Sequence, residues 1–294
     1  MSSTAGSTRG PAGDGAAPVT ALSRWRRHGL GILGLLLAAL AVAAALGAPL
    51  LAPHDPVASD FAQGLKPPGT PGHPWGTDQL GRDLLSRVLY GARVALFIGL
   101  CTVLLTAVVG GLVGLVAGFF EGWTGAVLMR LADVQLSFPF ILLALTINAI
   151  VGLGLRNIIV SLAAAGWVVY ARVVRGEVLS VKQREYVQAA AALGLGRRRI
   201  LFRHVLPNVA PSIIIVASLQ FSQFIVAEAA ISFLGFGVQP PTPAWGSMLS
   251  ESRDFLYVAW WLAAFPGAAL ALTALGINLV GDWLRDILDP KFRV

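Results

Sequence analysis

The chain has 294 residues, of which 56% are hydrophobic and only 13% are charged. A soluble domain carries about 25% charged residues, so this composition indicates a membrane protein. The formal net charge of +7 does not point to nucleic acid, because the basic residues lie at the ends of apolar runs without interleaved aromatic residues. The sequence therefore predicts contact with membrane lipid and no nucleic-acid partner.

Residue types that form metal and redox sites are sparse. A single cysteine, Cys101, lies inside an apolar run and excludes both an intramolecular disulfide and a cysteine-rich zinc site. The four histidines, His28, His54, His73 and His204, are scattered and lack the spacing of metal ligands. We therefore predict no metal site and no cofactor.

The amino-terminal third divides into a tail, a span and a loop. Residues 1–28, rich in small and polar residues and ending in a basic patch, are predicted to be a disordered cytoplasmic tail. Residues 29–53 carry no charge and exceed the roughly 20 residues that a spanning helix needs. A cleaved signal peptide is the alternative, although its apolar core is normally about 7–15 residues. Residues 54–90 are predicted to be an extracytoplasmic loop, in which Thr77 or Asp78 could cap a helix beginning near Gln79.

Five further spans are predicted from apolar runs, at 94–120, 134–155, 157–171, 205–227 and 255–281. A short cytoplasmic turn from Glu121 to Arg130 separates the first two of these runs. Glycine- and proline-rich residues 231–250 should form an outer loop or re-entrant segment, with Trp245 and Tyr257 at the membrane interface. Residues 282–294 should form a short cytoplasmic tail.

Two features of these spans suggest specific contacts. Gly110, Gly114 and Gly118 recur at every fourth residue, a spacing that lets two helices approach closely in a membrane. Arg130 and Asp133, three residues apart, could pair on one helical face at the cytoplasmic end of the third span. Anchoring of that helix end is a simpler role for the pair than a function in transport.

The stretch from Arg184 to Pro207 is a basic, amphipathic island between two long apolar runs. Tyr186, Ala189, Ala190 and Leu193 fall at helical spacing and form a narrow stripe of mostly small residues, which suits docking against another protein. Gly194 and Gly196 should end this helix, and a second short helix should run from Arg197 to Val205. An ordinary cytoplasmic loop with positive-inside arginines is the simpler alternative.

Three motifs and the C-terminal ending of the chain resemble those of a known family. Gln188-Ala189-Ala190, Gly194 and Leu206-Pro207 resemble the EAA loop of permease subunits of bacterial ABC importers. The segment from His73 to Arg93 and the segment from Ser232 to Ser247 resemble signatures of the dipeptide and oligopeptide branch, as does the ending DWLRDILDPKFR. Two positions depart from the general EAA pattern: Gln188 replaces the usual glutamate, and His204 replaces isoleucine as in the peptide branch.

The resemblance implies an all-α membrane protein of about six transmembrane helices with the type I ABC importer permease fold. Its core would be residues 91–281, with a cytoplasmic coupling loop at 178–207. Both termini would be cytoplasmic, which leaves six of the 22 Lys and Arg residues outside and the other 16 inside, in agreement with the positive-inside rule. The implied partners are a homologous second permease subunit, two cytoplasmic ABC ATPase subunits and an extracytoplasmic solute-binding protein.

The resemblance also assigns site residues. The residues expected to contact the ATPase are Glu185, Tyr186, Gln188, Ala189, Ala190, Gly194, His204, Leu206 and Pro207. Separately, Gln220, Gln223 and Glu228 are polar residues in the fifth span and are candidates for lining the translocation pathway, with interhelical hydrogen bonding as their alternative role.

The chain is not expected to be an enzyme. None of Lys66, Lys182 and Lys291 lies in a GxxxxGK[ST] phosphate-binding loop, so ATP hydrolysis must come from a partner. An ion-coupled secondary transporter remains as an alternative, with Glu228 and Asp133 as its only candidate coupling acids. An intramembrane enzyme would need a nucleophile–base pair or metal ligands, and no such group is visible. The sequence does not specify the transported solute.

Overall fold

The structure is a computed structural model that describes residues 21–288. The helices, in chain order, are α1 (Ala21–Leu51), η1 (Phe61–Gln63), α2 (Leu84–Phe119), α3 (Trp123–Leu136), α4 (Phe140–Val151), α5 (Leu155–Lys182), α6 (Glu185–Ala192), α7 (Arg197–Ile200), the π-helical turn η2 (Leu201–Val205), α8 (Leu206–Phe233), α9 (Trp245–Glu251), η3 (Arg253–Phe255) and α10 (Trp261–Leu288). The predicted tails fall partly outside the described range, since residues 1–20 and 289–294 lie beyond it.

An all-helical membrane protein is confirmed. No β-strand forms between residues 21 and 288; two isolated bridges, Thr70–His73 and Thr77–Asp83, only shape the loop before α2. Five helical segments are long and apolar enough to cross a membrane, and α3 with α4 makes a sixth if this pair, bent by 93°, counts as one span. The expectation of about six spans therefore holds in this form.

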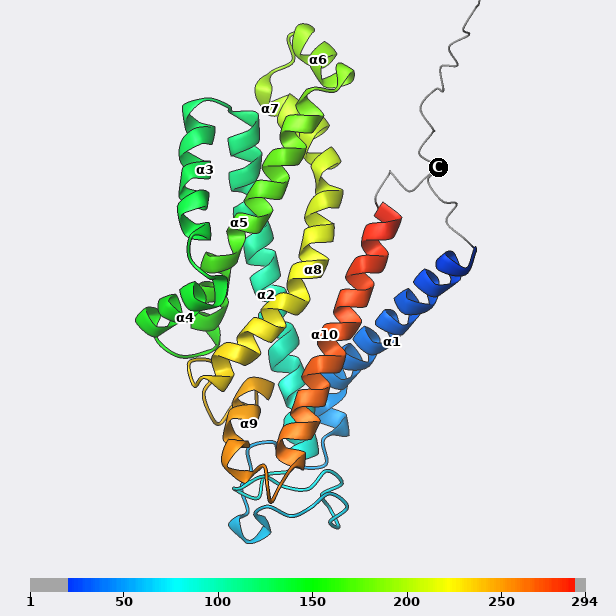
Figure 1. Ribbon diagram of the computed structural model, residues 1–294, viewed down its shortest axis with the longest axis vertical. Helices are drawn as coiled ribbons and strands as arrows, with labels where there is room; N and C mark the ends of the chain where they lie inside the picture. Colours follow the sequence, from blue (N-terminus) through cyan, green and yellow to red (C-terminus); the bar gives the residue numbers. More distant parts are fainter. Residues whose placement is uncertain (1–20, 289–294) are drawn as a thin grey trace, which may run out of the picture.

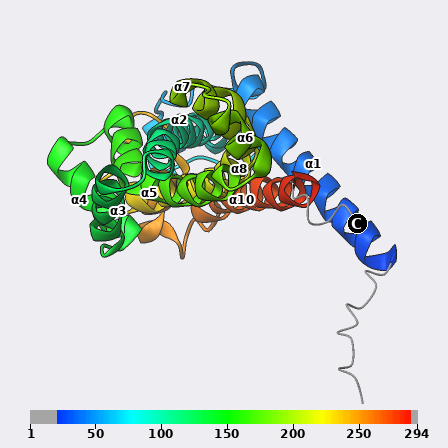
Figure 2. The ribbon, with the colours of Figure 1, turned by 90° about the horizontal axis from the view of Figure 1, so that it is seen from above.

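Figure 1 shows the long helices α2, α5, α8 and α10 running roughly along the long axis, with α6 and α7 at one end and the loop before α2 together with α9 at the other. Seen from above in Figure 2, α1 and α4 lie at opposite edges of the bundle, with α2, α5 and α8 between them. Helices α6 and α7, which belong to the predicted coupling loop, thus lie at the opposite end of the molecule from the loop of residues 52–83.

The prediction of a turn at 121–130 followed by one span at 134–155 was wrong. The chain forms α3 from Trp123 and breaks at Ser137–Pro139 before α4 begins. Proline lacks an amide hydrogen and disfavours helical geometry in the residue before it, so Pro139 cannot continue α3. The predicted fourth span was also too short, because α5 continues through its arginines to Lys182.

The glycine seam of α2 is confirmed as a contact with α5. An added Cβ at Gly110 would lie 2.2 Å from the Trp167 carbonyl oxygen, and one at Gly114 would lie 2.5 Å from the Ala171 carbonyl oxygen. At Gly118 the added atom would lie 2.8 Å from Val178 Cβ. Because only glycine admits this backbone approach, the three residues fix the spacing of the two central helices.

A second close approach joins the first and last spans. An added Cβ at Gly34 of α1 would lie 2.6 Å from Leu279 Cβ, and one at Gly276 of α10 would lie 2.7 Å from Leu37 Cβ. Figure 1 shows α1 crossing α10 in this region and then diverging from the bundle. The amino-terminal helix is therefore attached to the core mainly through α10.

Asp83 caps α2, contrary to the predicted cap at Thr77 or Asp78. Its side chain accepts hydrogen bonds from the Ser86 amide (2.8 Å) and the Ser86 hydroxyl (2.7 Å), so α2 begins at Leu84, inside the predicted loop. Trp245 also departs from its predicted interfacial position: it is 2% exposed, and its indole donates a hydrogen bond of 3.0 Å to the Val88 carbonyl. Tyr257 is fully exposed, as an interfacial residue would be.

Candidate coupling site and translocation face

Helix α6 is a short, sharply terminated element. Gly194 has a φ of +78°, and the amides of Gly194 and Leu195 donate to the carbonyls of Ala191 (3.0 Å) and Ala190 (3.2 Å). This pair of hydrogen bonds is the Schellman arrangement, which requires a residue in the left-handed region just after the helix. Gly194 therefore sets the direction in which the chain leaves α6, as its sequence position predicted.

A hydrophobic cluster anchors α6 to the bundle. Val187 and Ala190 point inward, 4% and 7% exposed, from the one face of α6 that packs. Val187 belongs to the cluster, whose other buried members come from α2, α5, α7, η2 and α8: Leu115, Val174, Val178, Val181, Ile200, Leu201, Val205 and Val209. The cluster thus joins α6 to three long spans, α2, α5 and α8.

The outward face of α6 remains uncovered in this chain. Leu193 is 80% exposed and Tyr186 is 43% exposed, and Gln188 and Ala189 are also exposed. Ala190 was predicted to lie on the docking stripe, but it is buried within this chain, at 7% exposed. The residue that sequence reasoning missed is Val187, whose side chain is the largest apolar group on the inward face.

Polar contacts hold the remaining coupling residues in place. The side-chain amide of Gln188 donates a hydrogen bond of 3.2 Å from Nε2 to the Gln183 carbonyl, and a glutamate carboxylate, which has no hydrogen to donate, could not make this bond. Arg184 Nη1 donates to Asn208 Oδ1 at 3.3 Å, and Asn208 Nδ2 donates to the His204 carbonyl at 2.7 Å. The ring of Tyr186 lies 6.4 Å from that of His204, centre to centre. These contacts join the start of α6 to the start of α8.

The end of α5, which leads into this site, is fixed to the end of α2. Lys182 Nζ donates to the Phe119 carbonyl at 3.1 Å and contacts the Glu121 carboxylate at 2.5 Å. The hydrogen bond and charge of Lys182 lower the pKa of Glu121 below its ordinary value. Because Glu121 is exposed, water screens this pair, and its main consequence is orientation rather than stability.

The predicted pairing of Arg130 with Asp133 gives way to a pairing between helices. Asp133 of α3 accepts a hydrogen bond from Arg172 of α5. Both side chains are about half exposed, at 49% and 53%. An exposed pair that links two neighbouring helices is consistent with the anchoring role expected from the sequence.

The three candidate pathway residues fall in different environments. Gln223 is exposed, whereas Gln220 is 7% exposed and Glu228 is 1% exposed. The Glu228 carboxylate accepts a hydrogen bond of 2.6 Å from Ser232 one turn along α8, and the Ser232 oxygen in turn accepts one of 3.2 Å from the Val238 amide. In this structure Glu228 thus holds the turn that follows α8, and only Gln223 presents its side chain to the outside.

Gln223 lines a shallow hollow of about 310 Å³ on one side of the bundle. The residues that line it come from α4, α8 and α10: Phe140, Ile141, Ser222, Gln223, Val226, Ala227 and Asn278. The Ser222 hydroxyl donates to the Asn278 side-chain oxygen and ties α8 to α10 at this place. Asn278 was missed by sequence reasoning, although an asparagine within the uncharged run of residues 255–281 is a detectable signal.

The end of the molecule opposite α6 is held by a buried network of charges. Arg82 Nε contacts Asp78 Oδ2 at 2.5 Å, and its Nη2 contacts Glu251 Oε2 at 2.8 Å. Arg87 contacts the same two carboxylates at 3.4 Å each. The network joins the loop before α2 to α9, so in this chain these motif residues have a structural role.

Comparison with known proteins identifies the family. Residues 110–294 match the family described as the binding-protein-dependent transport system inner membrane component, and residues 19–68 match the N-terminal TM domain of oligopeptide transport permease C. The chain belongs to this permease family. It is a multi-pass protein of the bacterial cytoplasmic membrane and resembles the dipeptide and oligopeptide branch, as its three motifs predicted.

Its relatives in this permease family are similar over almost their full length. The di/tripeptide transport system permease protein of Pseudomonas aeruginosa is 46% identical over 274 residues, which cover 90% of each chain. The dipeptide transport system permease protein of Alkalihalophilus pseudofirmus is 40% identical, with 93% of this chain and 92% of the relative covered. The glutathione transport system permease protein of Pectobacterium atrosepticum is also 40% identical, with 92% and 90% covered.

Proposed function

We propose that this permease forms half of the translocation pathway of an ATP-driven importer for dipeptides, oligopeptides or a related small solute such as glutathione. Its expected partners are a homologous second permease, two cytoplasmic ABC ATPase subunits and an extracytoplasmic solute-binding protein. The observation that carries the proposal is the exposed face of α6, whose opposite face is anchored through Val187 to a hydrophobic cluster that includes residues of the spans α5 and α8.

The proposed mechanism is mechanical. The outward residues of α6 would seat against an ATPase subunit, and closure of the ATPase dimer on ATP would displace α6 as a rigid body. Because α6 lies between α5 and α8 in the chain and shares one hydrophobic cluster with them, both helices would follow. A flexible tether could not transmit this displacement, which is why the packing of Val187 supports the proposal.

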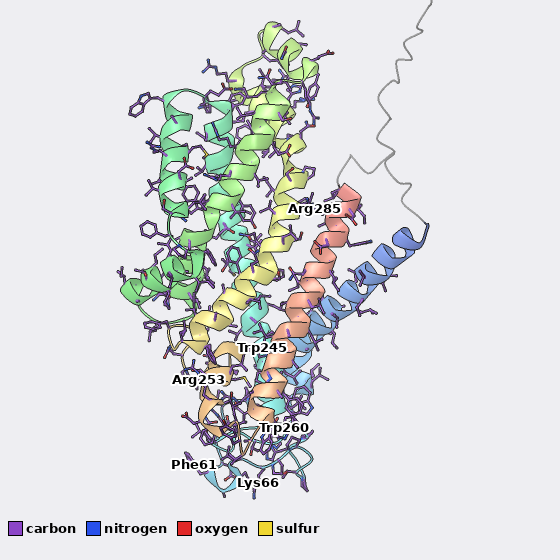
Figure 3. The ribbon with its side chains drawn as sticks, viewed as in Figure 1. Phe61, Lys66, Trp245, Arg253, Trp260 and Arg285 are labelled. Atoms are coloured by element: carbon purple, nitrogen blue, oxygen red, sulfur yellow. The ribbon has the colours of Figure 1, made fainter. Side chains whose placement is uncertain are left out.

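The same proposal also predicts which end of the molecule faces the cytoplasm. The α6 end would face the cytoplasm, and both termini would lie on that side. Figure 3 supports this orientation, because Arg285 of α10 lies toward the α6 end, whereas Phe61 and Lys66 lie at the opposite tip. The loop of residues 52–83 and α9 would then face the solute-binding protein.

A secondary transporter is less well supported. Its coupling acids would be Glu228 and Asp133, but the first is buried against Ser232 and the second pairs with Arg172. A carboxylate that carries protons or ions across a membrane must reach water or a path during the cycle. Neither acid lines the hollow beside Gln223.

Ala189→Arg is the variant that tests the coupling proposal. Ala189 is exposed on α6, so the larger side chain fits the isolated chain but should prevent docking of the ATPase. The complex purified in mild detergent and reconstituted with the solute-binding protein should lose at least about 90% of ATP-dependent uptake of a dipeptide, since docking is required for coupling.

Ala58→Arg is the matched control, because Ala58 is exposed in the loop at the opposite end of the molecule. This variant should retain copurification with the ATPase, which Ala189→Arg should reduce. Full transport by Ala189→Arg would refute the role of α6. Uptake by the purified chain alone, driven by an ion gradient without ATP, would favour the secondary transporter.

A further inference from the structure

Two histidine side chains and one aspartate side chain from separate parts of the sequence meet at the end of the molecule opposite α6. His54 follows α1, His73 lies in the loop before α2, and Asp83 caps α2. One nitrogen from each imidazole and one oxygen from the carboxylate lie within 4.8 Å of one another. His73 Nδ1 is 2.9 Å from Asp83 Oδ1, and His54 Nδ1 is 3.8 Å from the same oxygen.

The carboxylate is fixed in a way that leaves one oxygen for the histidines. Asp83 Oδ2 accepts both hydrogen bonds from Ser86, from its amide and its hydroxyl. Oδ1 therefore faces the two imidazoles, and the Asp83 side chain has no exposed surface. Metal-binding carboxylates are commonly held by this kind of outer hydrogen bond, which orients the coordinating oxygen.

The two histidines are also held by their backbones. The His54 amide donates to Ser86 Oγ at 3.1 Å, and the His73 amide donates to the Thr70 carbonyl at 2.8 Å. Their rings stack with centres 4.6 Å apart and planes inclined by 25°. Ser86 thus contacts both His54 and Asp83, so the start of α2 positions two of the three groups.

We propose that His54, His73 and Asp83 form a binding site for a divalent transition-metal ion of the zinc class. Two imidazole nitrogens and one carboxylate oxygen are a ligand set suited to Zn²⁺, and three protein ligands leave one coordination position open. Ligand atoms in a tetrahedral zinc site lie about 3.3 Å apart, given bonds of about 2.0–2.1 Å. Asp83 and His73 are already closer than this, and the half-exposed His54 has freedom to approach them.

The open position would be accessible from outside the protein. His54 lines a hollow of about 610 Å³ together with Asp55, Tyr90 and residues of the 241–243 segment. Water or a polar group of a solute could therefore complete the coordination. A bound ion would add to the contacts between the segment after α1 and the start of α2, which the hydrogen bond from His54 to Ser86 already joins.

Zinc binding to the full chain tests this site independently of transport. The protein, purified in detergent with an affinity tag that contains no histidine, is titrated with Zn²⁺ in one experiment and with Mg²⁺ in another. Wild type should bind one Zn²⁺ per chain and no Mg²⁺, because imidazole ligands disfavour the harder ion. His54→Gln and His73→Gln should each weaken Zn²⁺ binding by at least about tenfold.

His204→Gln is the matched control, since His204 lies near α6 at the other end of the molecule and should leave Zn²⁺ affinity unchanged. His54 is partly exposed, so its replacement should preserve the melting temperature of the metal-free protein while removing the increase that Zn²⁺ causes in wild type. Absence of stoichiometric Zn²⁺ binding by wild type, or equal affinity in His54→Gln, would overturn the proposal.

Discussion

Arg82 illustrates how strongly a single charged residue is committed to the fold. It is 4% exposed and contacts Asp78 and Glu251, which lie far apart in the sequence. Removing Arg82 would break the shortest contacts of both carboxylates and leave Arg87, at 3.4 Å from each, as their remaining cation. We therefore expect Arg82→Ala to lower the stability of the full chain by less than about 3–5 kcal/mol, the cost of a wholly uncompensated buried charge, measured as a reduced melting temperature in detergent.

Arg93 provides the control for the Arg82→Ala prediction. Arg93 is exposed on α2 and lies over the Tyr90 ring at 5.6 Å. An exposed cation–π contact contributes about 0.5–1 kcal/mol, so Arg93→Ala should lower the melting temperature much less. If both variants melted at the same temperature, the buried network would not be the source of stability that its geometry indicates.

At the scale of elements, the contact of α2 with α5 depends on the absence of side chains. An added Cβ at Gly114 would lie 2.5 Å from the Ala171 carbonyl oxygen, 2.8 Å from Val174 Cβ and 3.0 Å from Ala171 Cα, all on the facing helix. Gly114→Ala must therefore separate the helices and should destabilise the protein by about 1–3 kcal/mol, as overpacking does. Thermal unfolding of the detergent-solubilised chain measures this loss.

Gly176→Ala on the facing helix α5 is the matched control. No atom lies within 4 Å of a Cβ added at Gly176. Alanine favours a helix over glycine by about 1 kcal/mol, so this variant should be neutral or slightly stabilising. Opposite signs for the two glycine-to-alanine changes would show that packing, and not helix propensity, controls α2; a loss of stability in both would contradict this account.

The sequence predicted these helices more reliably than their ends and contacts. Apolar runs identify spans because a membrane demands about 20 such residues, and the period of four in Gly110, Gly114 and Gly118 identifies a packing face. The break before Pro139 was missed because the flanking residues are apolar on both sides. Trp245 was placed at an interface because its residue type favours one, whereas tertiary packing buries it against Val88.

The candidate site, too, was predicted from the sequence only in part. The motif positions of α6 were visible in the sequence, and the left-handed conformation of Gly194 follows from its residue type. Which residues face inward was harder to predict, since Ala189 and Ala190 are chemically identical and only the packing of the folded chain exposes the first and buries the second. The meeting of His54 with His73 depends on the path of a long loop, which no local pattern encodes.

At the scale of the whole molecule, α8 carries the three candidate pathway residues, of which Gln223 is exposed and Gln220 and Glu228 are buried. If the hollow beside Gln223 belongs to the water-filled pathway, Gln223→Cys should react with a water-soluble thiol reagent in the assembled importer, in a Cys101→Ala background. Gln220→Cys, on the same helix but 7% exposed, should stay unmodified, and Ala58→Cys should react as an exposed reference. A cysteine facing lipid remains protonated and meets no water-soluble reagent, so it is unreactive. Mass spectrometry of the modified chain therefore distinguishes the alternatives: modification at 223 similar to that at 58 supports a pathway position, whereas protection at 223 assigns this face to lipid or to a protein interface.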